Sequence, residues 1–88
     1  GAILDLQRQI AALERERGEI NTDQGRIRQN MGTGTIDRQS DLYTRYVKKL
    51  GEQETRLEAI ADALVTANTD LNRANADLAA YLAALNVE

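Results

Sequence analysis

The sequence predicts an all-α protein, an antiparallel two-helix coiled-coil hairpin whose second helix is longer than its first. Apolar residues recur at alternating steps of three and four along two long segments, which is the heptad pattern of a coiled coil. One stretch interrupts the pattern, QNMGTGTIDRQS at residues 29–40. Proline, phenylalanine and tryptophan are absent from the 88 residues, and such a composition favours long helices over a globular core.

We predict the first helix over residues 2–31. Its apolar stripe keeps one heptad phase throughout, although two polar residues, Arg17 and Gln24, occupy stripe positions. An unbroken phase of this length is a strong coiled-coil signal. The stripe consists of Ile3, Leu6, Ile10, Leu13, Arg17, Ile20, Gln24, Ile27 and Met31.

The second helix is predicted over residues 39–86. Leucine takes six successive a positions of its heptads, from Leu50 to Leu85, and Gln53 is the polar residue of the stripe. The whole stripe consists of Tyr43, Tyr46, Leu50, Gln53, Leu57, Ile60, Leu64, Ala67, Leu71, Ala74, Leu78, Tyr81 and Leu85.

The bend is predicted over residues 32–38, and so short a connection makes the two helices antiparallel neighbours. We expect Gly32 to end the first helix in the left-handed conformation. Either Asp37 or Ser40 can cap the N-terminus of the second helix. Elsewhere, glycines 18, 25 and 51 lie outside the stripe and cost about 1 kcal/mol each in a helix. They are either tolerated surface glycines or places where another surface approaches.

The predicted register places the two most awkward stripe residues, Arg17 and Gln53, opposite each other in one polar layer. A single polar layer in an apolar seam is a known way to fix register. The same alignment sets Ile10 opposite Ile60 and Leu13 opposite Leu57. It also brings two ion pairs together along the flanks, Glu16 with Arg56 and Asp23 with Lys49.

In that register residues 69–88 have no partner within the hairpin. An exposed leucine stripe requires a partner, and we assign it to oligomer contacts by Leu71, Leu78, Tyr81 and Leu85. A homo-oligomer, with a dimer favoured, or a helix of a longer parent chain would cover it. The chain begins inside a helical pattern, so we expect a fragment of a larger protein. A third way to cover the stripe is a break of the second helix at residues 66–70, after which the rest of the chain folds back as a third helix.

The composition of the chain argues against most kinds of catalytic and metal-binding site. The chain has no histidine and no cysteine, so no Ser/His/Asp or Cys/His constellation can be assembled, and we predict no enzyme. Glu54 and Glu58 lie one turn apart, but carboxylate metal sites in helix bundles generally include histidine, so we predict no metal and no cofactor. The net charge of −3 argues against nucleic acid, and we expect neither a membrane nor a small-molecule substrate as partner.

Charge is nevertheless uneven along the chain. Residues 23–49 hold six basic and three acidic side chains, so the bend end is basic. The GTGT stretch is better interpreted as a helix–helix bend than as a phosphate loop, because a helix precedes it and no lysine follows its glycines. An anion could still contact Arg26, Arg28, Arg38 and Lys48. This gives an alternative function, an anion-binding module for nucleic acid or phospholipid head groups.

Three stretches carry a resemblance to a known family: DQGRIRQNM at 23–31, SDLYTRYVKKLGEQETRLEAI at 40–60 and AYLAALNVE at 80–88. Their order resembles the C-terminal helical region of the uncharacterised bacterial mucoidy-inhibitor-like proteins, a family built around a domain of unknown function. The resemblance implies a helical appendage on a mainly β protein of the bacterial envelope. It implies no catalytic residues.

From the residues themselves we predict a structural or interaction module. The hairpin would serve as a coiled-coil spacer or docking arm of a larger bacterial protein of unknown function.

Overall fold

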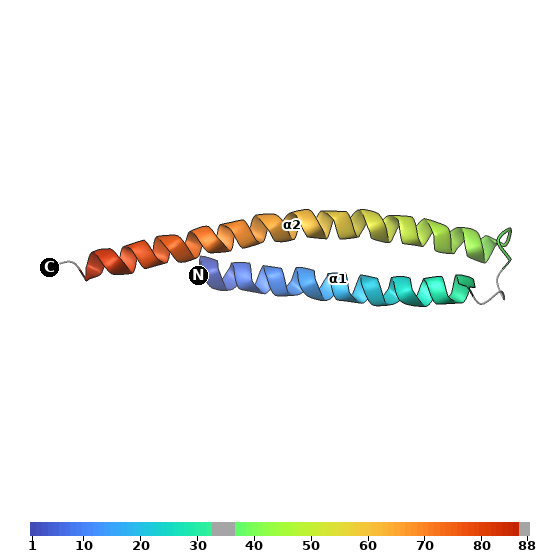
Figure 1. The fold of residues 1–88 in the computed structure, drawn as a ribbon, viewed down its shortest axis with the longest axis horizontal. Coiled ribbons are helices and arrows are strands. Elements are labelled where there is room, and N and C mark those ends of the chain that lie inside the picture. Colours follow the sequence, from blue (N-terminus) through green and yellow to red (C-terminus); the bar gives the residue numbers. More distant parts are fainter. Residues whose placement is uncertain (33–36, 87–88) are drawn as a thin grey trace.

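The fold is a long hairpin of two antiparallel helices (Figure 1). The computed structural model describes residues 1–32 and 37–86, in which α1 spans Ala2–Gly32 and α2 spans Asp41–Leu85. The molecule measures 75 × 16 × 16 Å, so it is a rod. The predicted all-α hairpin with a longer second helix is confirmed. Residues 33–36 of the predicted bend lie outside the described residues.

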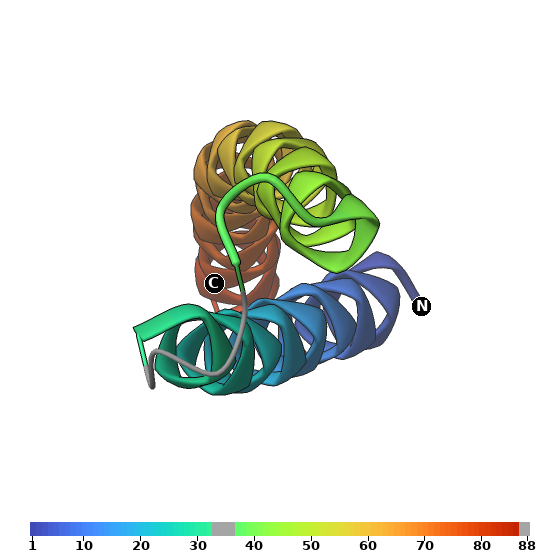
Figure 2. The same cartoon turned by 90° about the vertical axis from the view of Figure 1, so that its right-hand side faces the viewer.

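The two helices are not strictly parallel rods. Viewed from the bend end, α1 and α2 are inclined to each other, and the last turns of α2 curve toward the line of α1 (Figure 2). At the opposite end, α2 continues past the N-terminus of α1, so its final turns have no α1 backbone beside them (Figure 1). Neither helix carries an apolar stretch long enough to cross a membrane, within the part of the chain that the structure describes.

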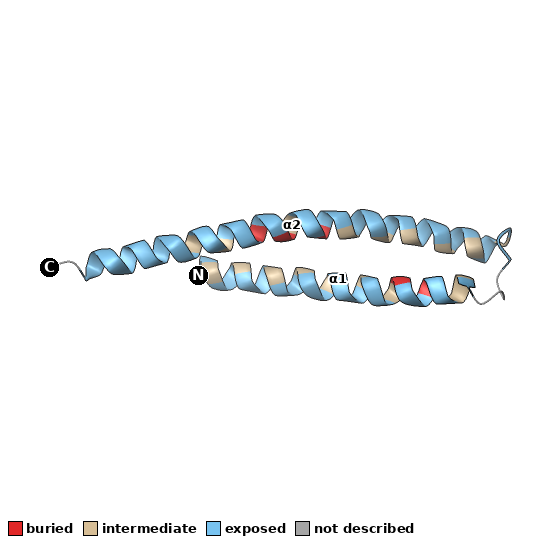
Figure 3. Cartoon of the chain, in the orientation of Figure 1, coloured by how far each residue is buried: buried red, intermediate tan, exposed pale blue. Residues whose placement is uncertain are grey.

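The buried surface is a narrow seam along the facing sides of the helices (Figure 3). Ile27 of α1 and Ile60 of α2 have no exposed surface, and Ala67 is 2% exposed. The half-buried residues at the predicted stripe positions continue this line toward both ends. The stripe therefore faces the partner helix, because residues three and four apart lie on one side of an α-helix.

The start of α2 is fixed by a cap. Ser40 is the N-cap residue, and its Oγ accepts a hydrogen bond of 3.1 Å from the backbone N–H of Tyr43. Asp37 supports the cap from outside the helix, since its backbone carbonyl accepts from the Ser40 backbone N–H and from the Ser40 hydroxyl. Of the two predicted caps, Ser40 is the one that the structure uses.

The predicted end of the first helix needs a correction. Gly32 is the last residue of α1 and does not adopt the left-handed backbone conformation. It therefore continues the helix where the left-handed terminating residue was expected.

The continuous second helix predicted through residues 66–70 is confirmed, because α2 runs through them without a break, and the alternative of a fold-back there is excluded. Two polar side chains there bond back within the helix: Asn68 donates to the Leu64 carbonyl and Thr69 donates to the Val65 carbonyl. These groups therefore do not compete with the helical backbone as caps would, and the heptad phase continues to Leu85.

Candidate functional site

The seam holds a clasp of four polar residues, which we call the polar clasp: Asp23 and Gln24 of α1 with Gln53 and Glu54 of α2. Gln53 Nε2 donates to Asp23 Oδ2 over 2.7 Å, and Gln24 Nε2 donates to Glu54 Oε1 over 3.0 Å. Each helix thus donates one side-chain amide N–H to a carboxylate of the other helix and accepts one in return. Gln24 is only 3% exposed, whereas the Glu54 side chain that accepts its hydrogen bond is 56% exposed. The clasp joins the helices at two adjacent positions.

Asp23 is the centre of the clasp. Its Oδ1 accepts from Arg26 Nη2 over 2.8 Å, on the same helix, and its Oδ2 also lies 3.2 Å from Lys49 Nζ. The hydrogen bonds from Arg26, then from Gln53 and Lys49, lower the pKa of the Asp23 carboxyl from 3.8 to about 2. Hydrogen bonds and nearby positive charge favour the ionised form of a carboxyl. Asp23 therefore remains charged over the whole neutral range.

One atom of the clasp has no partner. Gln53 Oε1 is buried and accepts no hydrogen bond within the part of the chain that the structure describes. A buried unsatisfied acceptor costs free energy, of the order of 1–3 kcal/mol. The clasp consequently specifies an alignment of the helices without being an optimal packing solution.

The predicted polar layer of Arg17 and Gln53 is wrong. Gln53 lies across from Asp23 and Gln24, so the helices are aligned about one heptad away from the predicted register. Carried along the seam, the observed alignment sets Arg17 opposite Ile60 and Ile3 opposite Ala74. Two shared surface hollows agree with it: Ile3 and Ala74 line one, and Arg17 and Leu64 line another.

The predicted layer does not form because Arg17 needs no polar partner across the seam. Its side chain is exposed, so the guanidinium stays in water and pays no cost of burial. The observed alignment also extends the seam, because Leu71 and Ala74 are half-buried at the end of the hairpin. It further gathers the two stripe glutamines into one region, where carboxylates accept their amides.

Both predicted flank ion pairs are confirmed. Arg56 makes a bidentate contact with Glu16, from Nε to Oε2 over 2.6 Å and from Nη2 to Oε1 over 2.7 Å. Lys49 contacts Asp23. The hydrogen bonds from Arg56 lower the pKa of the Glu16 carboxyl. These long side chains reach their partners in the observed alignment as well as in the predicted one, so the pairs alone do not decide the register.

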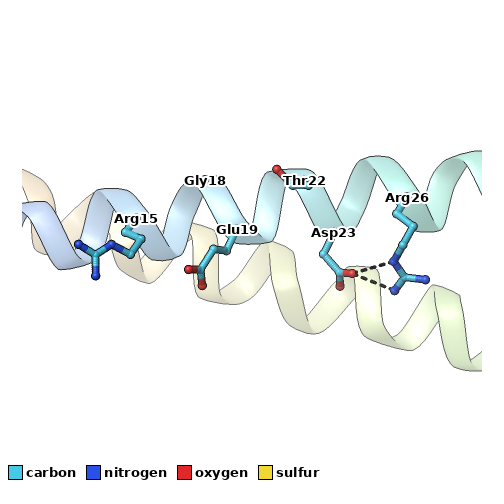
Figure 4. Close-up of a pocket in the computed structure, with 6 residues that line it drawn as sticks. All are labelled: Arg15, Gly18, Glu19, Thr22, Asp23 and Arg26. Atoms are coloured by element: carbon cyan, nitrogen blue, oxygen red, sulfur yellow. Dashed lines mark hydrogen bonds and ion pairs between the residues drawn. The ribbon is translucent and has the colours of Figure 1, made fainter.

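The outer side of the clasp opens onto a shallow surface hollow, lined by Arg15, Gly18, Glu19, Thr22, Asp23 and Arg26. Figure 4 shows the Asp23–Arg26 pair at one end of it and Gly18, without a side chain, in the middle. The hollow has both charge signs and no enclosed space. Among residues 1–32 and 37–86, no three acidic side chains lie together as metal ligands.

The predicted anion contacts are mostly engaged with carboxylates. Arg26 pairs with Asp23 at 2.8 Å, Arg28 with Glu54 at 3.6 Å and Lys48 with Glu52 at 4.0 Å. Arg38 is exposed just before the cap of α2. Three of the four positive charges therefore have a negative neighbour, which reduces the attraction that an external anion would feel.

The predicted oligomer contacts divide into two groups. Leu71 is half-buried where α1 begins, whereas Leu78, Tyr81 and Leu85 are exposed on the part of α2 beyond α1. Leu82, which is not among the predicted contacts, is 50% exposed beside them. It lies one residue after Tyr81 and widens the same apolar face.

The polar clasp is a feature that the heptad pattern did not predict. A signal was present, because α1 contains an acid–amide pair, Asp23–Gln24, and α2 contains the reversed pair, Gln53–Glu54. An alignment that sets Gln24 opposite Gln53 also brings each amide diagonally near the carboxylate that neighbours the other glutamine.

Comparisons with protein-family models, curated proteins and solved structures found no match. The resemblance to the mucoidy-inhibitor-like proteins therefore stays a prediction.

Proposed function

We propose that the hairpin is a structural and interaction module, a coiled-coil spacer that docks through the end of its longer helix. One observation carries this proposal: four large apolar side chains are exposed on the last turns of α2, past the N-terminus of α1. Their exposed fractions are 45% for Leu78, 62% for Tyr81, 50% for Leu82 and 62% for Leu85. We call this surface the α2 extension.

The spacing of these residues supports docking on a helix. Positions 78, 81, 82 and 85 are separated by three and four residues, so they share one face of α2. Contiguous exposed apolar surface of this kind marks interaction sites on proteins. The face also continues the seam stripe, so a helix laid against it would extend the packing already present in the hairpin.

We propose a second copy of the chain as the occupant, giving a dimer. The leucines and tyrosine of one α2 extension can pack against those of another in an antiparallel arrangement, because the stripe offers both a and d positions. The α2 extension is short and buries less area than a standard interface, so the dimer depends on concentration. A helix of a longer parent chain is the other occupant that the surface fits.

The anion-binding alternative has weaker support. It depends on Arg26, Arg28, Arg38 and Lys48, and three of these lie beside carboxylates. Retention on heparin at moderate salt, lost when the four charges are reversed, would favour it over docking.

Sedimentation equilibrium at micromolar concentrations tests the docking proposal. We expect a dimer for the unchanged chain and a monomer for the double variant Leu78→Gln and Leu85→Gln. The matched control is Ala76→Gln with Ala83→Gln, which adds the same polar groups at the same spacing on an exposed outer face. The control should remain a dimer. A monomer for the unchanged chain, or equal loss of the dimer in both variants, would refute a second copy as the occupant.

A further inference from the structure

The heptad stripe of this hairpin fits a second alignment of its helices. Both stripes repeat every seven residues, so a shift of seven returns stripe positions to stripe positions. In the observed register Ile20 lies opposite Leu57 and Leu13 opposite Leu64. In the shifted register Ile20 would lie opposite Leu50 and Leu13 opposite Leu57. Both alignments fill these layers with branched aliphatic side chains.

The connection between the helices is long enough for both registers. A shift of seven residues moves α2 by about 10 Å along the seam. The first residue of α2 lies about 6 Å past the level of Gly32 in the observed register, and about 5 Å short of it after the shift. The eight residues 33–40 can span up to about 26 Å, and packed helices lie about 8–10 Å apart.

Polar interactions divide into those common to both registers and those specific to one. The Glu16–Arg56 and Asp23–Lys49 pairs join long side chains and suit both alignments. The bonds from Gln53 to Asp23 and from Gln24 to Glu54 exist only in the observed register. The polar clasp therefore selects between the alignments, and its unsatisfied Gln53 Oε1 weakens that selection.

We infer that the hairpin is a two-register device, in which α2 slides by one heptad relative to α1 when the polar clasp opens. The slide moves α2 toward the N-terminus of α1 and sets Arg17 opposite Gln53. It uncovers Leu71 and Ala74 and lengthens the α2 extension by seven residues. The sliding stands independently of the proposed function, and only its effect on docking rests on that function.

Cysteine pairs report the register directly, because the chain has no cysteine of its own. Ile20→Cys with Leu57→Cys should form a disulfide in the observed register, and Ile20→Cys with Leu50→Cys should form one in the shifted register. Ile20→Cys with Leu64→Cys is the matched control, since it requires a slide in the opposite direction. We expect the first pair to form most, the second to form detectably, and the control to form least.

Two single substitutions should move the balance in opposite directions. Gln24→Leu places a leucine opposite Gln53 in the observed register but opposite Tyr46 in the shifted one, so it favours the shift. Arg17→Leu places a leucine opposite Ile60 in the observed register but opposite Gln53 in the shifted one, so it opposes the shift. Each should change the yield of the 20/50 disulfide by about tenfold, up for Gln24→Leu and down for Arg17→Leu.

A second reporter guards against local damage from the cysteines. Leu13→Cys with Leu64→Cys reads the observed register, and Leu13→Cys with Leu57→Cys reads the shifted one. If the 20/50 disulfide does not exceed its 20/64 control and the 13/57 disulfide does not form, even with Gln24→Leu in a chain whose circular dichroism stays helical, the two-register device is refuted. Sedimentation of the same variants is read separately: a register change without a change in dimerisation refutes docking and leaves the sliding intact.

Discussion

Gln53 Nε2 lies 2.7 Å from Asp23 Oδ2, and this bond aligns α1 with α2. It joins a half-buried amide to a carboxylate that also holds Arg26 and Lys49. Apolar heptads permit several alignments one heptad apart, so a directional polar contact has to choose among them. Asp23 therefore links the ion pairs on the flank to the register of the seam.

Stability should fall in acid as Asp23 takes up a proton. Its pKa is lowered from 3.8 to about 2 in the folded chain, so the unfolded chain binds the proton more readily. The resulting stabilisation is fully present above about pH 4 and is lost as the pH falls toward 2. Glu16, whose pKa is also lowered, acts in the same direction. Urea unfolding followed by circular dichroism between pH 2 and pH 6 measures this.

The variant Asp23→Asn distinguishes the contribution of the Asp23 carboxyl to acid stability from that of the Glu16 carboxyl. It should be less stable than the parent at pH 6, and the difference should shrink toward pH 2. A difference that is constant with pH would contradict the assignment of this acid transition to Asp23.

Shortening an apolar side chain in the centre of the seam should lower the stability of the hairpin more than any other apolar substitution. Ile27 and Ile60 have no exposed surface, so Ile27→Ala or Ile60→Ala should cost about 2–5 kcal/mol of unfolding free energy. Val65→Ala is the control, because Val65 is 68% exposed and alanine is the better helix former. Thermal unfolding by circular dichroism compares them. Equal effects at positions 60 and 65 would mean that the seam does not follow the predicted stripe.

Alanine at two helical glycines should stabilise the chain. A Cβ added at Gly18 or Gly25 meets nothing within 4 Å, so Gly18→Ala and Gly25→Ala should each add about 0.5–1 kcal/mol. Chemical denaturation at low protein concentration is the measurement. A loss of stability that grows with concentration would instead show that a second chain packs against these glycines.

Removing the cap of α2 should weaken the bend end. Ser40→Ala deletes the hydroxyl that accepts the Tyr43 N–H, and we expect a cost of about 1 kcal/mol. Thr44→Ala removes a hydroxyl one turn later that only bonds back to the Ser40 carbonyl, so it should be neutral or mildly stabilising. Urea denaturation of both variants decides. If the two lose equal stability, the cap is not what positions the start of α2.

The sequence was sufficient for the fold because the heptad pattern is local. Each turn from Ile3 to Ile27 and from Tyr43 to Leu85 repeats the same spacing, so the helices and their buried faces follow from neighbours along the chain. The flank pair Glu16–Arg56 could be predicted as well, because long side chains tolerate errors in alignment.

The register could not be predicted in the same way. Alignments one heptad apart present the same stripe, and the choice depends on where polar side chains end. Arg17 looked like the residue in need of a polar partner, but its long stem lets the guanidinium remain in water. Gln24, with a shorter side chain, is the residue that is buried and needs a partner across the seam.

A double-mutant cycle between Asp23 and Gln53 tests the central claim, that their contact aligns the hairpin. The singles Asp23→Ala and Gln53→Ala and the double variant would be compared by urea unfolding at pH 7. We predict that the double variant loses less stability than the two singles together, because each single already removes the shared bond. Additive losses would show that the two residues do not interact and would contradict the register described here.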